Sequence, residues 1–74
     1  SIMRKKILDI LTNKIWYSFE SILAGVVISQ LNDPHLNAES VKRVLSQQEL
    51  LRKELQEMLA ANLIIFENGY FRKT

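Results

Sequence analysis

The sequence predicts a mainly α domain of the α+β class whose last residues form a small β-hairpin. Three stretches place apolar residues at three- and four-residue spacing, which is typical of amphipathic helices. Near the end, Asn68-Gly69 separates two runs of apolar and aromatic residues, and this dipeptide favours a two-residue hairpin turn. The chain has 74 residues, enough for one small core, so we expect a single domain over residues 1–74.

The first element predicted is a helix over residues 2–13, followed by a short strand. The apolar residues that share one face of this helix are Met3, Ile7, Leu8, Ile10 and Leu11. Residues 15–17 are one β-branched and two aromatic side chains, which favour a strand. Since no alternating aromatic and basic pattern surrounds Trp16, Tyr17 and Phe19, we expect core and strand residues there rather than base-stacking platforms.

A second helix is predicted over residues 18–32, with Ser18 as its N-cap. Gly25 falls on the outward side of this helix, away from its apolar face. A loop follows at Asn32-Asp33-Pro34-His35, because proline disfavours helical geometry in the residue before it. We expect His35 to be an ordinary surface residue of that loop.

A third helical stretch begins after Asn37, which can act as its N-cap. Its apolar seam consists of Val41, Val44, Leu45, Leu51, Leu55, Met58 and Leu59. Gln48 occupies a position where the seam requires an apolar residue, and Leu50 falls on the opposite side. Either one helix bends near Gln48 or two helices meet there, and we expect two, over residues 38–46 and 48–61.

The chain then turns at Asn62, since asparagine tolerates the left-handed conformation in which helices often end. We expect the hairpin to span residues 63–74. A two-residue turn at Asn68-Gly69 fixes its register. The residue pairs that face each other in this register are Phe66 with Phe71 and Ile65 with Arg72. Because an isolated hairpin is marginally stable, the strand at residues 15–17 should pair with it.

Composition excludes several classes of site. The chain has no Cys and a single His, so neither a disulfide framework nor a thiolate- or His-based zinc site can form. Its Ser and Thr residues lack His or Cys partners at a catalytic spacing, and neither a phosphate-binding loop nor a paired-carboxylate motif is present. We therefore expect no enzyme activity, no cofactor, no metal site and no small-molecule ligand.

Hydropathy and the N-terminus argue against a membrane. The longest nearly apolar run, residues 22–28, is much shorter than the ~20 residues that span a bilayer. The N-terminus lacks a signal-peptide cleavage pattern. We expect no membrane partner and a cytoplasmic location, associated with the nucleoid if the chain binds DNA. Because Ser1-Ile2 precedes Met3, the chain can also be a piece cut from a longer protein.

One sequence pattern covers the end of the third helical stretch and the hairpin. The stretch ends in Leu55-Gln56-Glu57-Met58-Leu59-Ala60-Ala61-Asn62-Leu63-Ile64, and the hairpin ends in Gly69-Tyr70-Phe71-Arg72-Lys73-Thr74. This pattern resembles the winged-helix (winged helix-turn-helix) DNA-binding family. In many bacterial and archaeal regulators of that family, the recognition helix ends in leucine, two polar residues, a hydrophobic residue, three more residues and Gly-Leu-Ile, and the wing follows. Asn62 stands here in the place of the glycine.

The resemblance implies a double-stranded DNA-binding transcription regulator, of the small stand-alone sort found in prokaryotes and in archaeal plasmids and viruses. The residues implied for base readout are Gln47, Gln48, Arg52 and Lys53, since Gln can pair with adenine and Arg with guanine. The residues implied for contacts with the DNA backbone are Lys42, Arg43, Arg72, Lys73, Arg4, Lys5 and Lys6. Asn68 and Gly69 would form the tip of the wing, which is too short for deep insertion into a groove.

The sequence also permits other interpretations. Polar residues on a helix most often form a solvated face, and a net charge of +2 is weak for a nucleic-acid-binding domain. The same fold can instead be a protein–protein interaction module within a larger assembly, which the four Glu residues between positions 39 and 57 favour. A third possibility is a scaffold domain without a binding role. Leu50, opposite the seam, suggests a partner surface, so we also expect a homodimer.

Overall fold

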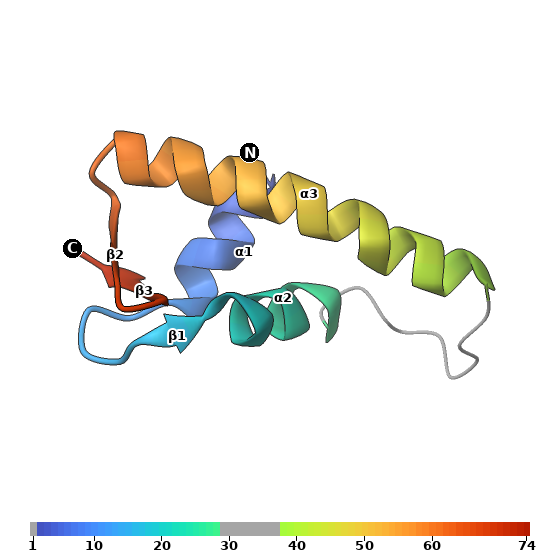
Figure 1. The fold of residues 1–74 in the computed structure, drawn as a ribbon, viewed down its shortest axis with the longest axis horizontal. Coiled ribbons are helices and arrows are strands. Elements are labelled where there is room, and N and C mark those ends of the chain that lie inside the picture. Colours follow the sequence, from blue (N-terminus) through green and yellow to red (C-terminus); the bar gives the residue numbers. More distant parts are fainter. Residues whose placement is uncertain (1, 29–37) are drawn as a thin grey trace.

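The computed structural model describes residues 2–28 and 38–74, which form three helices and one three-stranded antiparallel sheet (Figure 1). The elements in chain order are α1 (Ile2–Ile10), β1 (Tyr17–Ser18), α2 (Phe19–Ile28), α3 (Ala38–Ala60), β2 (Ile64–Glu67) and β3 (Tyr70–Lys73). The predicted α+β class is confirmed. The predicted end of the second helix, the loop with Pro34 and His35, and the cap at Asn37 lie outside the described residues.

α1 ends at Ile10 rather than at residue 13, because the side chain of Thr12 supplies a competing turn. Thr12 Oγ1 accepts hydrogen bonds from the backbone amides of Lys14 and Ile15, at 3.3 and 3.1 Å. Such local bonds between a hydroxyl and the backbone offer an alternative to further helix. The chain therefore leaves α1 and turns toward the sheet.

α2 begins where the sequence predicts. Ser18 Oγ accepts a hydrogen bond from the amide of Ser21 at 3.1 Å, so the N-cap is confirmed. The outward placement of Gly25 is wrong, because this residue lies against α1. A Cβ atom at Gly25 would stand 2.8 Å from Ile10 Cδ1, so the absence of a side chain lets the two helices approach closely.

α3 is one continuous helix, and the prediction of two helices over 38–46 and 48–61 is wrong. Ser46 caps no new helix, since its hydroxyl donates to the backbone carbonyl of Lys42 at 2.8 Å, a bond within an unbroken helix. The fully buried seam residues are Leu51, Leu55 and Met58. They lie in the half of α3 that covers α1, whereas the first half extends away from α1 and the sheet (Figure 1). Among the described residues, the buried part of the seam begins at Leu51, so Gln48 lies at the edge of that core.

The C-terminus of α3 has the left-handed residue that the sequence predicts. Asn62 has a φ of 60°. Its amide donates to the carbonyl of Leu59 at 3.0 Å, and the amide of Leu63 donates to the carbonyl of Met58 at 3.0 Å. These two bonds form a Schellman motif, which satisfies the last carbonyls of the helix and directs the chain into β2.

β2 and β3 form the predicted hairpin. Asn68 and Gly69 occupy its turn with φ angles of 52° and 87°, as a two-residue turn with two positive φ angles requires. The predicted register is confirmed, with Phe66 opposite Phe71 and Ile65 opposite Arg72. The rings of Phe66 and Phe71 are 4.6 Å apart between centroids and tilted by 53°.

β1 pairs with the other edge of β3, which gives the strand order β1-β3-β2 and confirms that the first strand joins the hairpin. The strand is shorter than predicted, since it comprises Tyr17 and Ser18 and not residues 15–17. Tyr17 packs against the core, but Trp16 does not belong to it, because 38% of its surface is exposed. Placing Trp16 in the core is therefore wrong.

The core lies between the three helices and the inner face of the sheet, which closes one end of the helical layer (Figure 1). Its buried members are Ile7, Leu11, Ile22, Val26, Leu51, Leu55, Met58, Ile64 and Phe71. Every helix and two of the strands contribute to this set. Among the described residues, no helix combines the length and the apolar character that crossing a bilayer requires.

Candidate nucleic-acid interface

The face of α3 opposite its buried seam carries polar and charged side chains. Helical spacing of three and four residues brings exposed side chains into one line along this face. The members of this exposed line are Lys42, Ser46, Glu49, Lys53 and Gln56. Two of the predicted DNA-contacting residues, Lys42 and Lys53, therefore lie on the same face of one helix.

Arg43 and Arg52 are exposed and flank this line on opposite sides. The guanidinium carbon of Arg52 lies 4.7 Å from the centroid of the Phe19 ring, at the start of α2. This cation–π contact restrains Arg52 while leaving its outer edge open to solvent. The four cations predicted on α3 thus all reach the surface of the helix.

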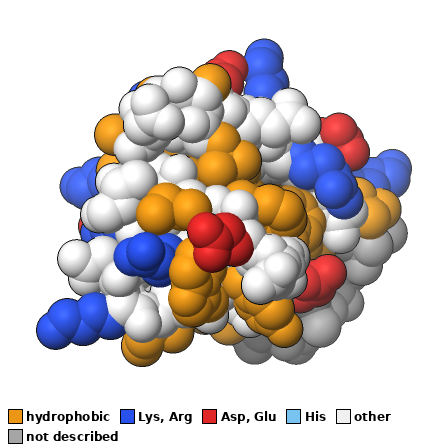
Figure 2. All heavy atoms as spheres, turned by 60° about the vertical axis from the view of Figure 1, so that its left-hand side comes forward, with side chains coloured by type: hydrophobic (Ala, Val, Ile, Leu, Met, Phe, Trp, Pro, Cys, Tyr) orange, Lys and Arg blue, Asp and Glu red, His pale blue; other side chains and the backbone are white. Residues whose placement is uncertain are grey.

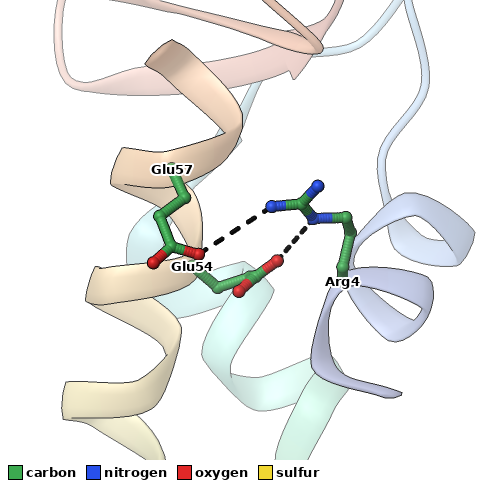
Figure 3. A network of polar contacts seen from close by, with 3 residues as sticks. All are labelled: Arg4, Glu54 and Glu57. Carbon is green, nitrogen blue, oxygen red and sulfur yellow. Dashed lines mark hydrogen bonds and ion pairs between the residues drawn. The ribbon is translucent and has the colours of Figure 1, made fainter. Parts of the chain in front are cut away.

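Two carboxylates of α3 face α1 and meet Arg4 there (Figure 3). Arg4 Nε lies 2.5 Å from Glu54 Oε1, and Arg4 Nη2 lies 3.9 Å from Glu57 Oε2. Glu54 is the more buried partner, with 13% of its side chain exposed. Arg4, a predicted contact of the DNA backbone, is therefore engaged by α3, and the charges of Glu54 and Glu57 are partly compensated.

Gln47 and Gln48, both predicted to read bases, are half-buried. Oε1 of Gln47 is buried and makes no hydrogen bond. Adjacent helix positions point about 100° apart, so these two side chains lie on either side of the buried seam. The structure does not bring Gln47 and Gln48 onto the exposed line with Lys53.

The basic residues of the hairpin are tied to the turn after α1. Arg72 Nη1 donates to the carbonyl of Asn13 at 2.8 Å, and its guanidinium carbon lies 4.9 Å from the centroid of the Trp16 ring. The amide of Lys73 donates to the carbonyl of Thr12 at 2.8 Å. The predicted wing tip, Asn68 and Gly69, is exposed. Of the remaining predicted contacts on α1, Lys5 is exposed and Lys6 is half-buried.

Two hollows beside the hairpin were not predicted. One, of about 330 Å³, lies between the start of α2, the second half of α3 and the hairpin. Its lining residues are Phe19, Glu20, Arg52, Leu55, Gln56, Leu59, Phe66, Gly69 and Phe71. The second, of about 380 Å³, is lined by Trp16, Glu67, Asn68 and Tyr70. The alternation of side chains along the strand could have indicated the second hollow, because it places residues 70 and 72 on the face of the sheet opposite Phe71.

Figure 2 brings the sheet end of the molecule forward. Hydrophobic side chains gather on this surface, with an acidic side chain among them and Lys or Arg side chains toward its margins. Throughout residues 2–28 and 38–74, no three His, Cys, Asp or Glu side chains gather as a metal site would require.

Comparison with known proteins gives no match. No family model matches the sequence, and neither a curated protein nor a solved structure matches it significantly.

Proposed function

We propose that this protein is a winged-helix regulator of transcription that binds double-stranded DNA by placing α3 in the major groove. The observation that carries the proposal is the exposed line of α3, a polar face with cations opposite a buried seam. The order α1-β1-α2-α3-β2-β3 and the strand order β1-β3-β2 support it. In this proposal α2 and α3 are the helix pair of a helix-turn-helix, and the hairpin is the wing.

The dimensions of α3 suit this role. A helix of 23 residues is about 35 Å long at 1.5 Å per residue, and its diameter of roughly 10–12 Å fits the major groove. The first half of α3 extends away from α1 and the sheet (Figure 1). The exposed line, which runs through both halves of α3, is the face that would lie in the groove.

The contacts of α3 make its charge distribution more favourable for binding DNA. The helix has four cations and four glutamates in its sequence. Glu54 and Glu57 meet Arg4 on the side facing α1, so they are turned from the exposed line. The four cations of the helix then outnumber the two remaining glutamates, Glu39 and Glu49. The exposed surface of α3 is therefore more attractive to phosphates than the sequence of the helix alone suggests.

Roles within the interface follow from exposure. Lys42 and Arg43, in the first turns of α3, would bind phosphates and set the position of the helix. Lys53 and Arg52 would read base edges, because they are exposed whereas Gln47 and Gln48 are half-buried. The glutamines would reach bases after a change of side-chain rotamer.

Fluorescence anisotropy of a labelled random duplex, across about 50 to 200 mM salt, tests the proposal. Phosphate contacts make the logarithm of the binding constant fall linearly with that of the salt concentration, by about 0.9 per phosphate neutralised. We expect a slope of several for the protein, and a slope smaller by about one for Lys42→Ala. Lys14→Ala, which removes an exposed charge from the turn after α1, is the matched control and should retain most of the duplex affinity. Absence of binding at the lowest salt contradicts the proposal.

A protein-interaction module is the second candidate, and a specific observation favours it. Leu45 and Leu50 are 57% and 52% exposed on α3, and the hollow of about 330 Å³ is lined largely by aromatic and aliphatic side chains. Apolar surface of this kind is typical of contacts between proteins. Loss of duplex binding together with a mass above 8.6 kDa in solution would favour this candidate over the first.

A further inference from the structure

The outer face of the sheet carries a set of side chains that the core does not use. Phe71 and its neighbour on β1, Tyr17, face the helices and pack in or against the core. Successive residues of a strand point to opposite faces, so Trp16, Tyr70 and Arg72 lie on the outer face. Tyr70 is 48% exposed there, and Trp16 is exposed as described above.

Trp16 is held in place although it is exposed. The guanidinium of Arg72 lies against one face of the indole ring, with its carbon 4.9 Å from the ring centroid. Arg72 is itself anchored, because it donates to the carbonyl of Asn13 at 2.8 Å. An aromatic ring fixed in this way offers a flat surface to a ligand with little further loss of side-chain entropy.

A hollow of about 380 Å³ adjoins these aromatic residues, within the usual range of about 300–1,000 Å³ for ligand sites. Its lining combines the rings of Trp16 and Tyr70 with the carboxylate of Glu67 and the amide of Asn68. The rings provide stacking surfaces, and the polar groups can form hydrogen bonds with the edge of a flat heterocycle. A carboxylate, for example, accepts from the exocyclic amino group of cytosine.

Two cations are close to the indole ring of Trp16, since Arg72 lies over it and Lys14 is two residues before it in the chain. Arg72 donates to the carbonyl of Asn13 in the turn after α1, and the exposed Lys14 follows Asn13 directly. Lys73 is not part of this set, because it is opposite the buried Ile64 and so belongs to the inner face of the sheet. Glu67 is the acidic member of the lining, so cations are in excess around it. An aromatic ligand attached to anionic groups fits this combination, whereas a cationic ligand would be repelled.

We propose that the outer face of the sheet binds single-stranded nucleic acid, by stacking an unpaired base on Trp16 and Tyr70 while Lys14 and Arg72 hold the adjoining phosphates. A base inside a duplex is stacked on its neighbours and presents only its edges, so it has no free face to offer. The outer face of the sheet is therefore distinct from the exposed line of α3, and it binds a different form of nucleic acid.

The intrinsic fluorescence of the protein provides a direct test, because Trp16 is its single tryptophan. Stacking of a base on the indole ring should quench this emission. We expect oligodeoxycytidine of about 12 nucleotides, at about 50 mM salt, to quench it in a saturable manner. Duplex DNA of the same length and concentration should leave the emission nearly unchanged. With two phosphate contacts, the affinity should fall with a salt slope of about 1.4, at roughly 0.7 per contact on a single strand.

Two substitutions of Tyr70 separate stacking from other effects. Tyr70→Val keeps a residue that favours strands but removes the ring, and should weaken binding by about 5- to 100-fold. Tyr70→Phe keeps the ring and should bind within about twofold of the original protein. Lys42→Ala, on α3, should leave single-strand binding unchanged while it weakens duplex binding, so the two proposals fail independently. The inference is overturned by absence of quenching, by equal quenching with duplex, or by equal affinities of the two Tyr70 variants.

Discussion

Asn62 holds a position that glycine usually occupies at helix ends. Its φ of 60° places the backbone in the left-handed region, where a Cβ atom costs roughly 1–2 kcal/mol for most residues. Asparagine lowers part of that cost through local hydrogen bonds of its short side chain. The Schellman bonds of the amides at positions 62 and 63 depend on this conformation.

Substitutions at Asn62 should therefore change stability in opposite directions. We expect Asn62→Gly to raise the free energy of unfolding by a few tenths to about 1 kcal/mol, because glycine adopts positive φ without steric cost. Asn62→Ala should lower it by about 1 kcal/mol. Urea unfolding followed by circular dichroism measures both changes. Equal effects of the two substitutions would show that the left-handed conformation does not limit stability.

Gly25 and Ile10 should be energetically coupled, since a Cβ at position 25 would meet Ile10 Cδ1 at 2.8 Å. Alanine is favoured over glycine inside a helix by about 1 kcal/mol, but this contact opposes the gain. Ile10→Val removes the Cδ1 atom and leaves room. The effect of Gly25→Ala on the unfolding free energy should therefore depend on residue 10. We expect this effect to be more favourable by at least about 0.5 kcal/mol in the Ile10→Val background than in the original protein. A double-mutant cycle in urea checks this coupling, and purely additive effects would contradict it.

At the scale of elements, the sequence predicted features that depend on neighbouring residues. The hairpin register follows from Asn68-Gly69 alone, and the cap of α2 follows from Ser18. The continuity of α3 could not be predicted in this way. A polar Gln48 in an apolar seam indicates a break only if the core continues on both sides, and in the part of the chain that the structure describes the buried seam begins only at Leu51.

Only the part of the candidate site that depends on neighbouring residues was predicted from the sequence. Helical spacing alone places Lys42 and Lys53 on one face of α3. The engagement of Arg4 by Glu54, 50 residues away in the chain, and of Arg72 by Asn13, 59 residues away, depends on how helices and sheet meet. The half-buried state of Gln47 and Gln48 depends on the same packing.

The packing of α1 on α3 leads to a prediction about their ion pairs. Arg4→Met keeps an apolar stem but leaves the largely buried carboxylate of Glu54 without this cation, and should lower the unfolding free energy by about 1–2 kcal/mol. Glu57→Gln, at a distance of 3.9 Å and with half of the side chain exposed, should change it by less than about 0.5 kcal/mol. The double variant Arg4→Met/Glu54→Leu should recover most of the loss. Thermal and urea unfolding of the three variants measures these differences. A larger loss from Glu57→Gln than from Arg4→Met would be incompatible with this account.

At the scale of the whole molecule, the exposed apolar side chains of α3 suggest association of two copies. One small domain makes few phosphate contacts, and two copies on half-sites about 34 Å apart would bind duplex DNA more tightly. We expect light scattering at tens of micromolar to give twice the chain mass of 8.6 kDa. Leu50→Lys should return the mass to that of one chain, since Leu50 is half exposed and its replacement leaves the core intact. Lys53→Ala is the control on the exposed line, and a single-chain mass for the original protein would exclude the dimer.

β1 contributes two residues to the sheet, yet it joins the chain before α2 to the chain after α3. A hairpin such as β2 and β3 forms within microseconds, whereas the docking of β1 must close a long loop of chain. β1 should therefore be the last strand to dock during folding and the first to detach in the native state. Each detachment would separate Trp16 from Arg72 and leave an unpaired edge on β3, which invites pairing with another molecule. A ligand seated across Trp16 and Tyr70 would bridge the two strands, and would slow both amide hydrogen exchange in the sheet and aggregation through that edge.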